Sequence, residues 1–538
     1  MALTFEQASS RGNRQENSLG ILTFAFSIRN HLATGLATVK GAVENKETLL
    51  LHQRDFFTSA LTEARKNPVI AYVYGEKADA TRLRAFTEML LAHQIEVYEL
   101  DKTQNIEGLS FEKGHAYIVH TEQPQYRLVE SIFAKTTDFD DSVFYDASTW
   151  TLVLAYNLAH SSAKSKITPG KRITNLDIEN SSVPVQSQYA YLLDWMDYNA
   201  PGALYQLQEK GVITQCILKP VTATTALGPK NFQPGSISIP VASQLITSDS
   251  LFRIIQDIST NKQVNFESIN TGLSLKGVDL GSYNVQTIRK PQALILTGLG
   301  ISSYEVGEVW FLLDKQLQMP ITKAELANFD ELNLRRYNTI VLVHGSYNTL
   351  NINAEDNLKK WIADGGTLIT FKAASAWAIN KGLAQGEVIL ARDTAITHNR
   401  IDFIDAIATE GAYSVGGSIY EVDLDITHPL GFGYSDRKLP VYRNSTVFLA
   451  PSNNPYSTIA KYTNFPWLSG YVSKSNLNKI ANSAALLVSD HGRGRVIMFS
   501  DNPNFRGTWY GTNRLFFNAL FFGSLIRTPG PGTSKQLE

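Results

Sequence analysis

Residues 293–300 read Ala-Leu-Ile-Leu-Thr-Gly-Leu-Gly, an apolar run that ends in a glycine-rich turn. Residues 293–297 have the length of a buried strand, and residues 304–317 carry apolar side chains at helical spacing. Ser302 or Ser303 could cap this helix, because both hydroxyls precede its first turn. A strand, a tight turn and an amphipathic helix in this order are typical of one crossover in a parallel sheet. The stretch therefore predicts an α/β fold.

The same alternation recurs along the chain. Further elements of this kind are expected as a strand at 339–343, a helix at 354–364 closed by Gly365 and Gly366, and a strand at 367–371. Apolar strands also alternate with helices over residues 69–134 and again over residues 189–261. We therefore expect two or three doubly wound, mostly parallel sheets of the flavodoxin-like type.

Changes in composition divide the chain into four expected parts. At 538 residues it exceeds the ~250–300 at which one hydrophobic core stops growing. Residues 1–45 read as one strand that passes into a helix, and residues 46–285 as an α/β region. A segment rich in Ser, Lys, Asn and Pro at 161–188 could split that region into two sub-domains. Residues 286–527 form the last α/β domain, and residues 528–538 a disordered tail.

The overall composition excludes several classes of partner. The net charge is -1, which offers no basic footprint for nucleic acid. No apolar run approaches the ~18–20 residues of a membrane span, so we expect a soluble chain without membrane insertion. The single cysteine, Cys216, excludes an intrachain disulfide and a cysteine-based zinc cluster. It stands in an apolar run and is expected to be a buried structural thiol.

Two segments near the amino end carry a family resemblance. Residues 6–10 read Glu-Gln-Ala-Ser-Ser, and residues 26–30 read Phe-Ser-Ile-Arg-Asn. They resemble the Tyr-Gln-Ala-Ser-Gly segment and the Phe-Glu-Leu-Arg-Asp strand that end the catalytic domain of zinc carboxypeptidases, the M14 peptidases. Residues 298–310 and 501–507 are similar to stretches in family members with large extra regions. The resemblance implies the carboxy-terminal portion of a protein that hydrolyses C-terminal peptide bonds.

The resemblance also implies that this chain is inert by itself. Ser27 stands where the family has its glutamate base, and a serine cannot take a proton from zinc-bound water as a carboxylate does. The family's zinc ligands would fall before Met1, so we expect no metal or other cofactor in this chain and zinc only in the full-length family. Glu6 is the one candidate catalytic residue, because it could supply the missing carboxylate. The alternative is a surface glutamate.

Separation from a catalytic domain would leave the strand and helix of residues 1–45 without neighbours. We expect their apolar face to be covered by the following α/β region or by a second copy of the chain, which would make a homo-oligomer. The sequence does not give the cell compartment of the full-length protein, which could be periplasmic or secreted.

Residues from about 291 onward also resemble a class I glutamine amidotransferase domain. Such enzymes need a cysteine on a tight strand-to-helix turn. Here the strand at 367–371 leads to Lys372-Ala373-Ala374-Ser375, without a cysteine. A serine-type hydrolase that uses Ser346 or Ser375, with His428 as the base, is one alternative function.

Three polar loops fall beyond the ends of the expected strands, where open α/β sheets bind ligands. They supply the candidate binding residues Ser302, Ser303, His344, Ser346, Asp501, Asn504 and Arg506. These side chains predict an independent module that binds a peptide or a small polar ligand. In the alternative, Asp501 and Arg506 pair with each other and brace the last helix.

Overall fold

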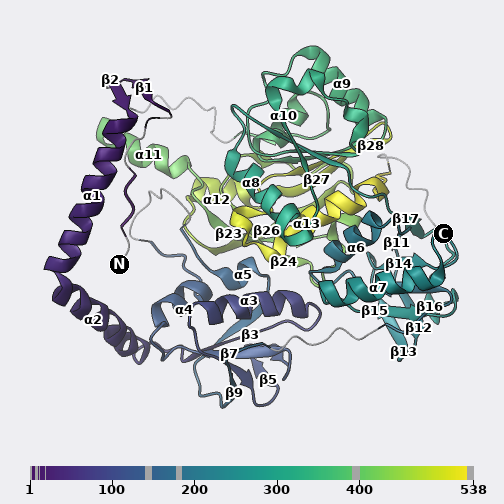
Figure 1. Cartoon of the computed structure of the whole chain (residues 1–538), viewed down its shortest axis with the longest axis horizontal. Helices are drawn as coiled ribbons and strands as arrows, with labels where there is room; N and C mark the ends of the chain where they lie inside the picture. Colours follow the sequence, from purple (N-terminus) through teal and green to yellow (C-terminus); the bar gives the residue numbers. More distant parts are fainter. Residues whose placement is uncertain are drawn as a thin grey trace. The chain divides into compact units, whose positions relative to one another are not determined.

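The computed structural model describes residues 3–6, 10, 12–18, 20–139, 148–176, 184–390, 400 and 402–529 (Figure 1). It divides into one unit of Met1–Ile70 with Thr121–Arg127 and a second of Ala71–His120 with Leu128–Glu538. Helices and strands are mixed, and the strands form several sheets, which confirms the expected α/β class. The expected tail at 528–538 lies outside the described residues except for its first two positions.

The first unit is mainly helical. Its described elements are the antiparallel hairpin β1 (Arg14–Asn17) and β2 (Gly20–Thr23), and the helices α1 (Phe24–Glu44) and α2 (Lys46–Ala64). The Thr23 hydroxyl accepts a hydrogen bond from the Phe26 N–H at 3.2 Å and begins α1. Residues 26–30 therefore lie in a helix, and the strand expected there is wrong. The run rich in Ala and Leu that follows favours a helix, and the cap extends it upstream.

A five-stranded sheet opens the second unit, in the order β8-β3-β7-β4-β9. Its elements are β3 (Ala71–Gly75), β4 (Val97–Leu100), β7 (Ala116–His120), β8 (Ala159–Ala163) and β9 (Pro169–Ile173), with α3 (Ala80–Ala92), α4 (Tyr126–Phe133) and α5 (Leu152–Ala155). β5 (Gln104–Ile106) and β6 (Leu109–Phe111) form a separate hairpin. Two strands thus lie in or overlap the segment 161–188, which was expected to be a connection.

The next sheet has eight strands. They are β10 (Ala190–Leu193), β11 (Gln215–Ile217), β12 (Val221–Thr225), β13 (Gly228–Phe232), β14 (Ile237–Pro240), β15 (Phe266–Ile269), β16 (Lys276–Gly277) and β17 (Val285–Thr287), with α6 (Ala200–Glu209) and α7 (Ser248–Lys262). The strand pairs of this sheet and of the five-stranded sheet are antiparallel. The mostly parallel arrangement expected for these regions is therefore wrong. β12 and β13 show one reason, because a two-residue loop can join only antiparallel neighbours.

The third sheet combines both arrangements, in the order β19-β18-β20-β21-β28-β27-β26-β23-β24. Its parallel half contains β18 (Ala293–Thr297), β19 (Thr322–Glu325), β20 (Thr339–Leu342), β21 (Thr367–Phe371) and β28 (Gly494–Phe499). Its antiparallel half contains β23 (Ser418–Leu424), β24 (Lys438–Arg443), β26 (Thr458–Ser469) and β27 (Ala484–His491), and β22 (Val388–Ile389) and β25 (Phe448–Leu449) pair beside it. The flavodoxin-like assignment itself stays a prediction.

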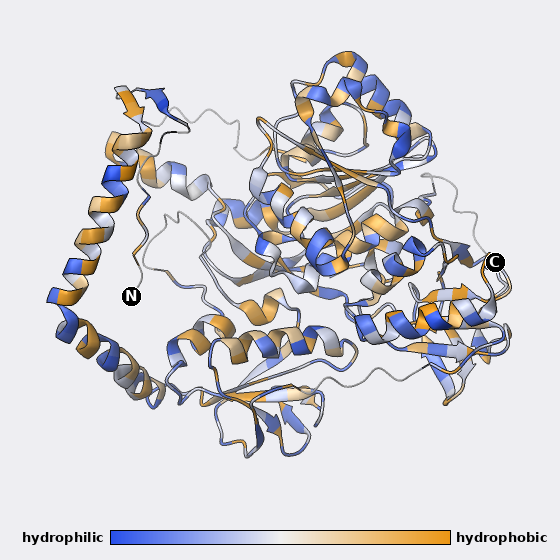
Figure 2. Ribbon diagram, in the orientation of Figure 1, coloured by the Kyte–Doolittle hydropathy of each residue, from blue (hydrophilic) through white to orange (hydrophobic). Residues whose placement is uncertain are grey.

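Helices connect the strands of the third sheet. They are α8 (Ser303–Phe311), the π-helix η1 (Leu312–Leu317), α9 (Ile352–Ala363), α10 (Ala373–Asn380), α11 (Ala406–Tyr413), α12 (Lys474–Ile480) and α13 (Tyr510–Phe522). β18, β20, β21 and β28 carry mostly apolar residues (Figure 2), as expected for strands that are covered on both faces. None of the helices among the described residues combines the length and apolar character needed to span a bilayer.

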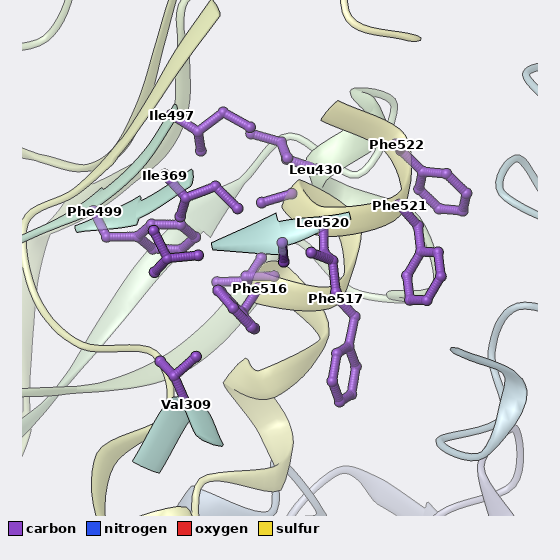
Figure 3. Packing of buried hydrophobic residues seen from close by; sticks show 14 of the residues in the cluster. Val309, Ile369, Leu430, Ile497, Phe499, Phe516, Phe517, Leu520, Phe521 and Phe522 are labelled. Atoms are coloured by element: carbon purple, nitrogen blue, oxygen red, sulfur yellow. The ribbon is translucent and has the colours of Figure 1, made fainter. Parts of the chain in front are cut away.

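Helix α13 lies in the core of the second unit. Figure 3 shows its apolar side chains Phe516, Phe517, Leu520, Phe521 and Phe522 in one cluster with Ile369, Ile497 and Phe499 of the sheet. The rings of Phe371 and Phe516 lie 5.9 Å apart in an edge arrangement. The same helix buries the polar side chains of Asn513, Arg514 and Asn518. Its polar residues must therefore find hydrogen-bond partners inside the protein.

Candidate functional site

The first two polar loops meet at the carboxyl edge of the parallel strands. Ile301 and Gly345 form an isolated bridge, and the Ser302 N–H donates to the His344 carbonyl oxygen at 2.9 Å. The Ser346 N–H donates to the Gly300 carbonyl oxygen at 3.0 Å. A Cβ at Gly345 would lie 2.9 Å from that same oxygen, so glycine permits the close approach. The structure thus brings together the loops at 298–303 and 344–348.

A strained lysine stands between strand β21 and helix α10. Lys372 has φ 51° and ψ -119°, a conformation that is rare for a residue with a side chain. Backbone strain of this kind costs about 1–3 kcal/mol and persists where the surrounding structure holds it. Hydrolases and amidotransferases place a nucleophile on such a strand-to-helix turn. The resemblance to amidotransferases would place a cysteine at this turn. The turn holds Lys372 instead.

Two carboxylates hold the Lys372 ammonium. Its Nζ lies 2.7 Å from Glu305 Oε1 and 3.4 Å from Asp501 Oδ1, and it donates to Asn444 Oδ1 at 2.5 Å. The side chains of Lys372, Glu305 and Asp501 are each only 7% exposed. A buried cation with two carboxylates needs further hydrogen bonds to be stable.

Backbone N–H groups supply those further bonds. Glu305 Oε2 accepts from the His344 N–H at 2.9 Å. Asp501 Oδ2 accepts from the Asn444 N–H at 3.0 Å, and Asp501 Oδ1 from the Asn502 N–H at 2.8 Å. The ion cluster therefore ties the loop after β20 and the loop after β28 to the turn after β21.

The cluster keeps the lysine charged. Burial alone would lower the pKa of Lys372, but Asp501 and Glu305 outweigh that effect and raise the pKa above its ordinary value. A protonated ammonium has no lone pair and cannot attack a carbonyl group. Lys372 therefore supplies no nucleophile at this turn.

A third carboxyl group lies beside the cluster. Burial raises the pKa of Glu308 to about 7, and the neighbouring Glu305 adds to this increase. Glu308 Oε1 accepts from the Arg506 N–H at 2.5 Å, and Glu308 Oε2 accepts from the side-chain amide of Asn502. The loop at 501–507 is thus bound to helix α8.

The predicted residues of the third loop divide into buried and exposed side chains. Asp501 pairs with Lys372, so the expected Asp501–Arg506 pair is wrong. The Arg506 side chain is exposed, and its guanidinium carbon lies 5.0 Å from the centre of the Trp150 ring and 5.2 Å from that of Phe505. Asn504 is fully buried, and its side-chain amide has no hydrogen-bond partner among the described residues.

The predicted residues of the first two loops also have separate roles. Ser302 caps α8, because its hydroxyl accepts from the Glu305 N–H at 3.4 Å. Ser303, His344 and Ser346 are exposed at the same edge.

The sequence did not lead us to Glu305, Lys372 and Asn444. A lysine directly after the buried strand 367–371 was the available signal, since a charge there needs a partner.

In the portion of the chain that the structure describes, Ser375 and His428 of the serine-type alternative form no hydrogen bond with each other. Ser375 is fully buried, and its hydroxyl lies 2.8 Å from the Thr370 hydroxyl, 2.9 Å from the Phe499 carbonyl oxygen and 3.1 Å from that of Thr370. His428 Nδ1 accepts from the Leu430 N–H at 3.1 Å, and burial lowers the pKa of His428 to about 4. Both side chains are therefore engaged in hydrogen bonds with other residues.

Glu6 is exposed in the first unit, and its neighbours Gln7, Ala8 and Ser9 lie outside the described residues. Within the described part of the chain, no group of three or more His, Cys, Asp or Glu side chains could hold a metal ion.

No protein-family model matches the chain, and no curated protein matches it. Parts of it are similar to solved structures. A ThuA-like protein from Bacteroides uniformis is 14% identical over 42% of this chain and 88% of its own, with a TM-score of 0.27. A ThuA-like protein from Parabacteroides merdae is 14% identical over 45% and 93%, with a TM-score of 0.28. A β-galactosidase from Bacillus circulans is 11% identical over 43% and 30%, with a TM-score of 0.25.

These findings correct the expected family. These three structures are ThuA-like proteins and a β-galactosidase, and neither a family model nor a curated protein of the zinc carboxypeptidases matches the chain. The prediction of an M14 peptidase, with its zinc and its proteolysis, is therefore wrong. Within the chain, the segment at 26–30 that carried the resemblance belongs to helix α1 and not to a strand. The proposed role of Glu6 rested on that resemblance and has no other support.

Proposed function

We propose that the carboxyl edge of the parallel strands is a non-catalytic binding site for a small polar ligand that carries a carboxylate. The observation that carries this proposal is the pairing of the buried Lys372 ammonium with two carboxylates. The position suited to a nucleophile holds a protonated ammonium, 2.7 Å from one buried carboxylate and 3.4 Å from another. Such a cluster fixes loop geometry and leaves no reactive group at the turn.

The exposed groups around this cluster favour an anionic ligand. The Arg506 guanidinium lies over the Trp150 ring, whose side chain is half exposed. Stacking on an aromatic face orients a guanidinium, and a guanidinium recognises carboxylates. His344, Ser303 and Ser346 add exposed polar groups at the same edge. A free acid or the carboxyl end of a short peptide fits this combination.

Calorimetry with matched ligands tests the proposal. The tripeptide Ala-Ala-Ala, with a free or an amidated carboxyl end, and succinate would be titrated into the full chain. Saturable binding of the free tripeptide or of succinate is expected, weakened about ten- to hundredfold in Arg506→Ala, because hydrogen bonds to a charged group contribute about 1.5–3 kcal/mol. Arg437→Ala is the control, because Arg437 is exposed and pairs with Asp423 at 2.8 Å.

Two results would contradict the proposal. One is the absence of saturable binding of both ligands, or unchanged binding in Arg506→Ala. The other is covalent labelling of Ser346 or Ser375 by a fluorophosphonate probe, which requires an activated serine.

A further inference from the structure

A hollow is formed where five helical segments of the second unit meet. It has a volume of about 310 Å³ and is lined by α3, by the beginning of α6, by the end of α7, by η1 and by the first residue of α13. Nothing in the proposed function uses these residues. The lining is partly polar and partly apolar, and it includes two cations, Arg84 and Lys262.

The two cations are unequally neutralised. Arg84 Nε donates to Glu88 Oε1 at 2.7 Å, and Arg84 Nη1 donates to Gln263 Oε1 at 3.4 Å. Lys262 Nζ donates to the neutral Gln318 Oε1 at 2.9 Å, and no ion pair joins Lys262 to a carboxylate among the described residues. Burial lowers the pKa of Lys262, because the ammonium has lost part of its water without gaining a negative partner.

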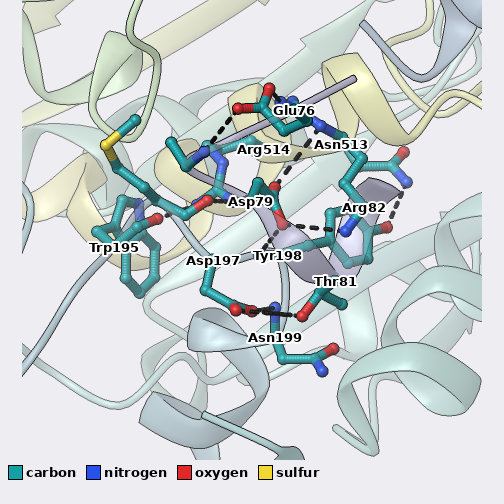
Figure 4. A network of polar contacts seen from close by, with 12 residues as sticks. Glu76, Asp79, Thr81, Arg82, Trp195, Asp197, Tyr198, Asn199, Asn513 and Arg514 are labelled. Carbon is teal, nitrogen blue, oxygen red and sulfur yellow. Dashed lines mark hydrogen bonds and ion pairs between the residues drawn. The ribbon is translucent and has the colours of Figure 1, made fainter. Parts of the chain in front are cut away.

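Two tyrosines of the lining, Tyr198 and Tyr510, are held in place by their neighbours. The rings of Tyr198 and Tyr510 stack with centres 4.7 Å apart. The Tyr198 hydroxyl donates to Gln316 Oε1 at 2.5 Å and accepts from the Asn513 side-chain amide at 2.7 Å. Figure 4 shows Tyr198 and Thr81 beside the buried Asp197, whose carboxylate accepts from the Thr81 hydroxyl at 2.9 Å. The hollow is thus formed before any ligand enters.

We propose that this hollow binds a small organic anion, either a carboxylate or a phosphate ester, between Lys262 and Arg84. An anionic group would supply the countercharge that Lys262 lacks. The edge of the Tyr510 ring, whose faces stack on Tyr156 and Tyr198, would contact an apolar part of the same molecule. The aromatic ring of the ligand would lie toward Tyr510 and its acidic group toward Lys262.

Titration of the full chain with phenyl phosphate, benzoate and uncharged phenol tests this assignment, and the first two separate the phosphate from the carboxylate source. Saturable binding of phenyl phosphate or benzoate, without binding of phenol, is expected. Lys262→Met and Arg84→Met should each weaken it about ten- to hundredfold. Lys210→Met is the matched control, because Lys210 is exposed at the far end of α6.

Unchanged thermal unfolding would show that the variants are folded. The assignment is overturned if neither anion binds saturably, or if binding persists in both Lys262→Met and Arg84→Met. Arg506→Ala should leave this binding unchanged, so this site and the site at the sheet edge are tested independently.

Discussion

Two buried ion networks of the second unit use cations in different ways. In one, Lys372 lies between Glu305 of helix α8 and Asp501, and the three side chains meet at a single edge of the third sheet. In the other, Arg514 of helix α13 lies 3.5 Å from Asp79, which is 435 positions earlier in the chain (Figure 4). The first network shapes an edge, and the second joins distant parts of the sequence.

The second network also depends more on the backbone. The Arg514 guanidinium donates to the carbonyl oxygen of Trp195 and, at 2.8 Å, to that of Met196. Asp79 accepts from the N–H groups of Arg82 and Tyr198, each at 3.0 Å. A planar guanidinium can satisfy several acceptors that a neutral side chain would leave unpaired. Loss of Arg514 should therefore cost more than loss of Lys372.

The largest expected effect is that of Arg514→Met. The change leaves the Trp195 and Met196 carbonyl oxygens without this donor and Asp79 with less countercharge. We expect a loss of about 5 kcal/mol in the free energy of unfolding, measured by urea denaturation. The control Arg493→Met, at an exposed pair with Asp364, should stay within about 0.5 kcal/mol. A loss below that of Lys372→Met would reverse the comparison.

Lys372→Met should have the next largest effect. Glu305 and Asp501 would keep their bonds to the His344 and Asn502 N–H groups but would lose the cation between them. We expect a loss of about 3 kcal/mol in the free energy of unfolding, because an uncompensated buried charge is expensive. The matched variant Lys381→Met breaks a more exposed pair with Glu355 and should cost about 1 kcal/mol or less. Equal losses in both variants would show that burial does not matter here.

The sequence predicted the parallel half of the third sheet best. Strand β18 was expected at 293–297 and β21 at 367–371, and both are observed with these bounds. Their apolar runs are short and end at clear stop signals, which makes such strands easy to recognise. Cys216 was expected to be buried because it stands in an apolar run, and its burial is confirmed. Apolar composition and local turn signals were together sufficient to predict the bounds of these strands.

The pairing of strands and of charged side chains could not be predicted in the same way. Apolar periodicity does not say whether two strands run parallel or antiparallel, so the first two sheets of the second unit were assigned the wrong arrangement. At the site, too, the position of the loops was predicted but the pairing of the charged residues was not. Three polar loops were expected together and the first two do meet, but the pairing of Asp501 with Lys372 depends on residues 129 positions apart. Sequence alone offered Arg506 as a nearer cation for the same carboxylate.

Glu308→Gln tests the electrostatics beside the Lys372 network. The pKa of Glu308 is raised from 4.5 to about 7, so across this range the folded chain holds a proton that the unfolded chain releases. The wild type should therefore lose stability as the pH rises through this window, by about 1–2 kcal/mol after allowance for solvent screening. The Gln variant, neutral at every pH, should lack this part of the loss. Urea denaturation at pH 4.5 and at about pH 8 measures the difference, and equal pH dependence in the two proteins would contradict it.

Ser302→Ala should have the smallest effect and completes the comparison with a neutral contact at the same edge. The Ser302 hydroxyl accepts one long hydrogen bond, 3.4 Å from the Glu305 N–H, at the beginning of α8. Loss of a helix cap costs about 0.5–2 kcal/mol, and the length of this bond places the expected loss near about 0.5 kcal/mol. Ser303→Ala, at an exposed position inside the helix, should change the free energy of unfolding even less. A loss in Ser302→Ala as large as that in Lys372→Met would mean that the cap, rather than the buried charge, holds Glu305 toward the lysine.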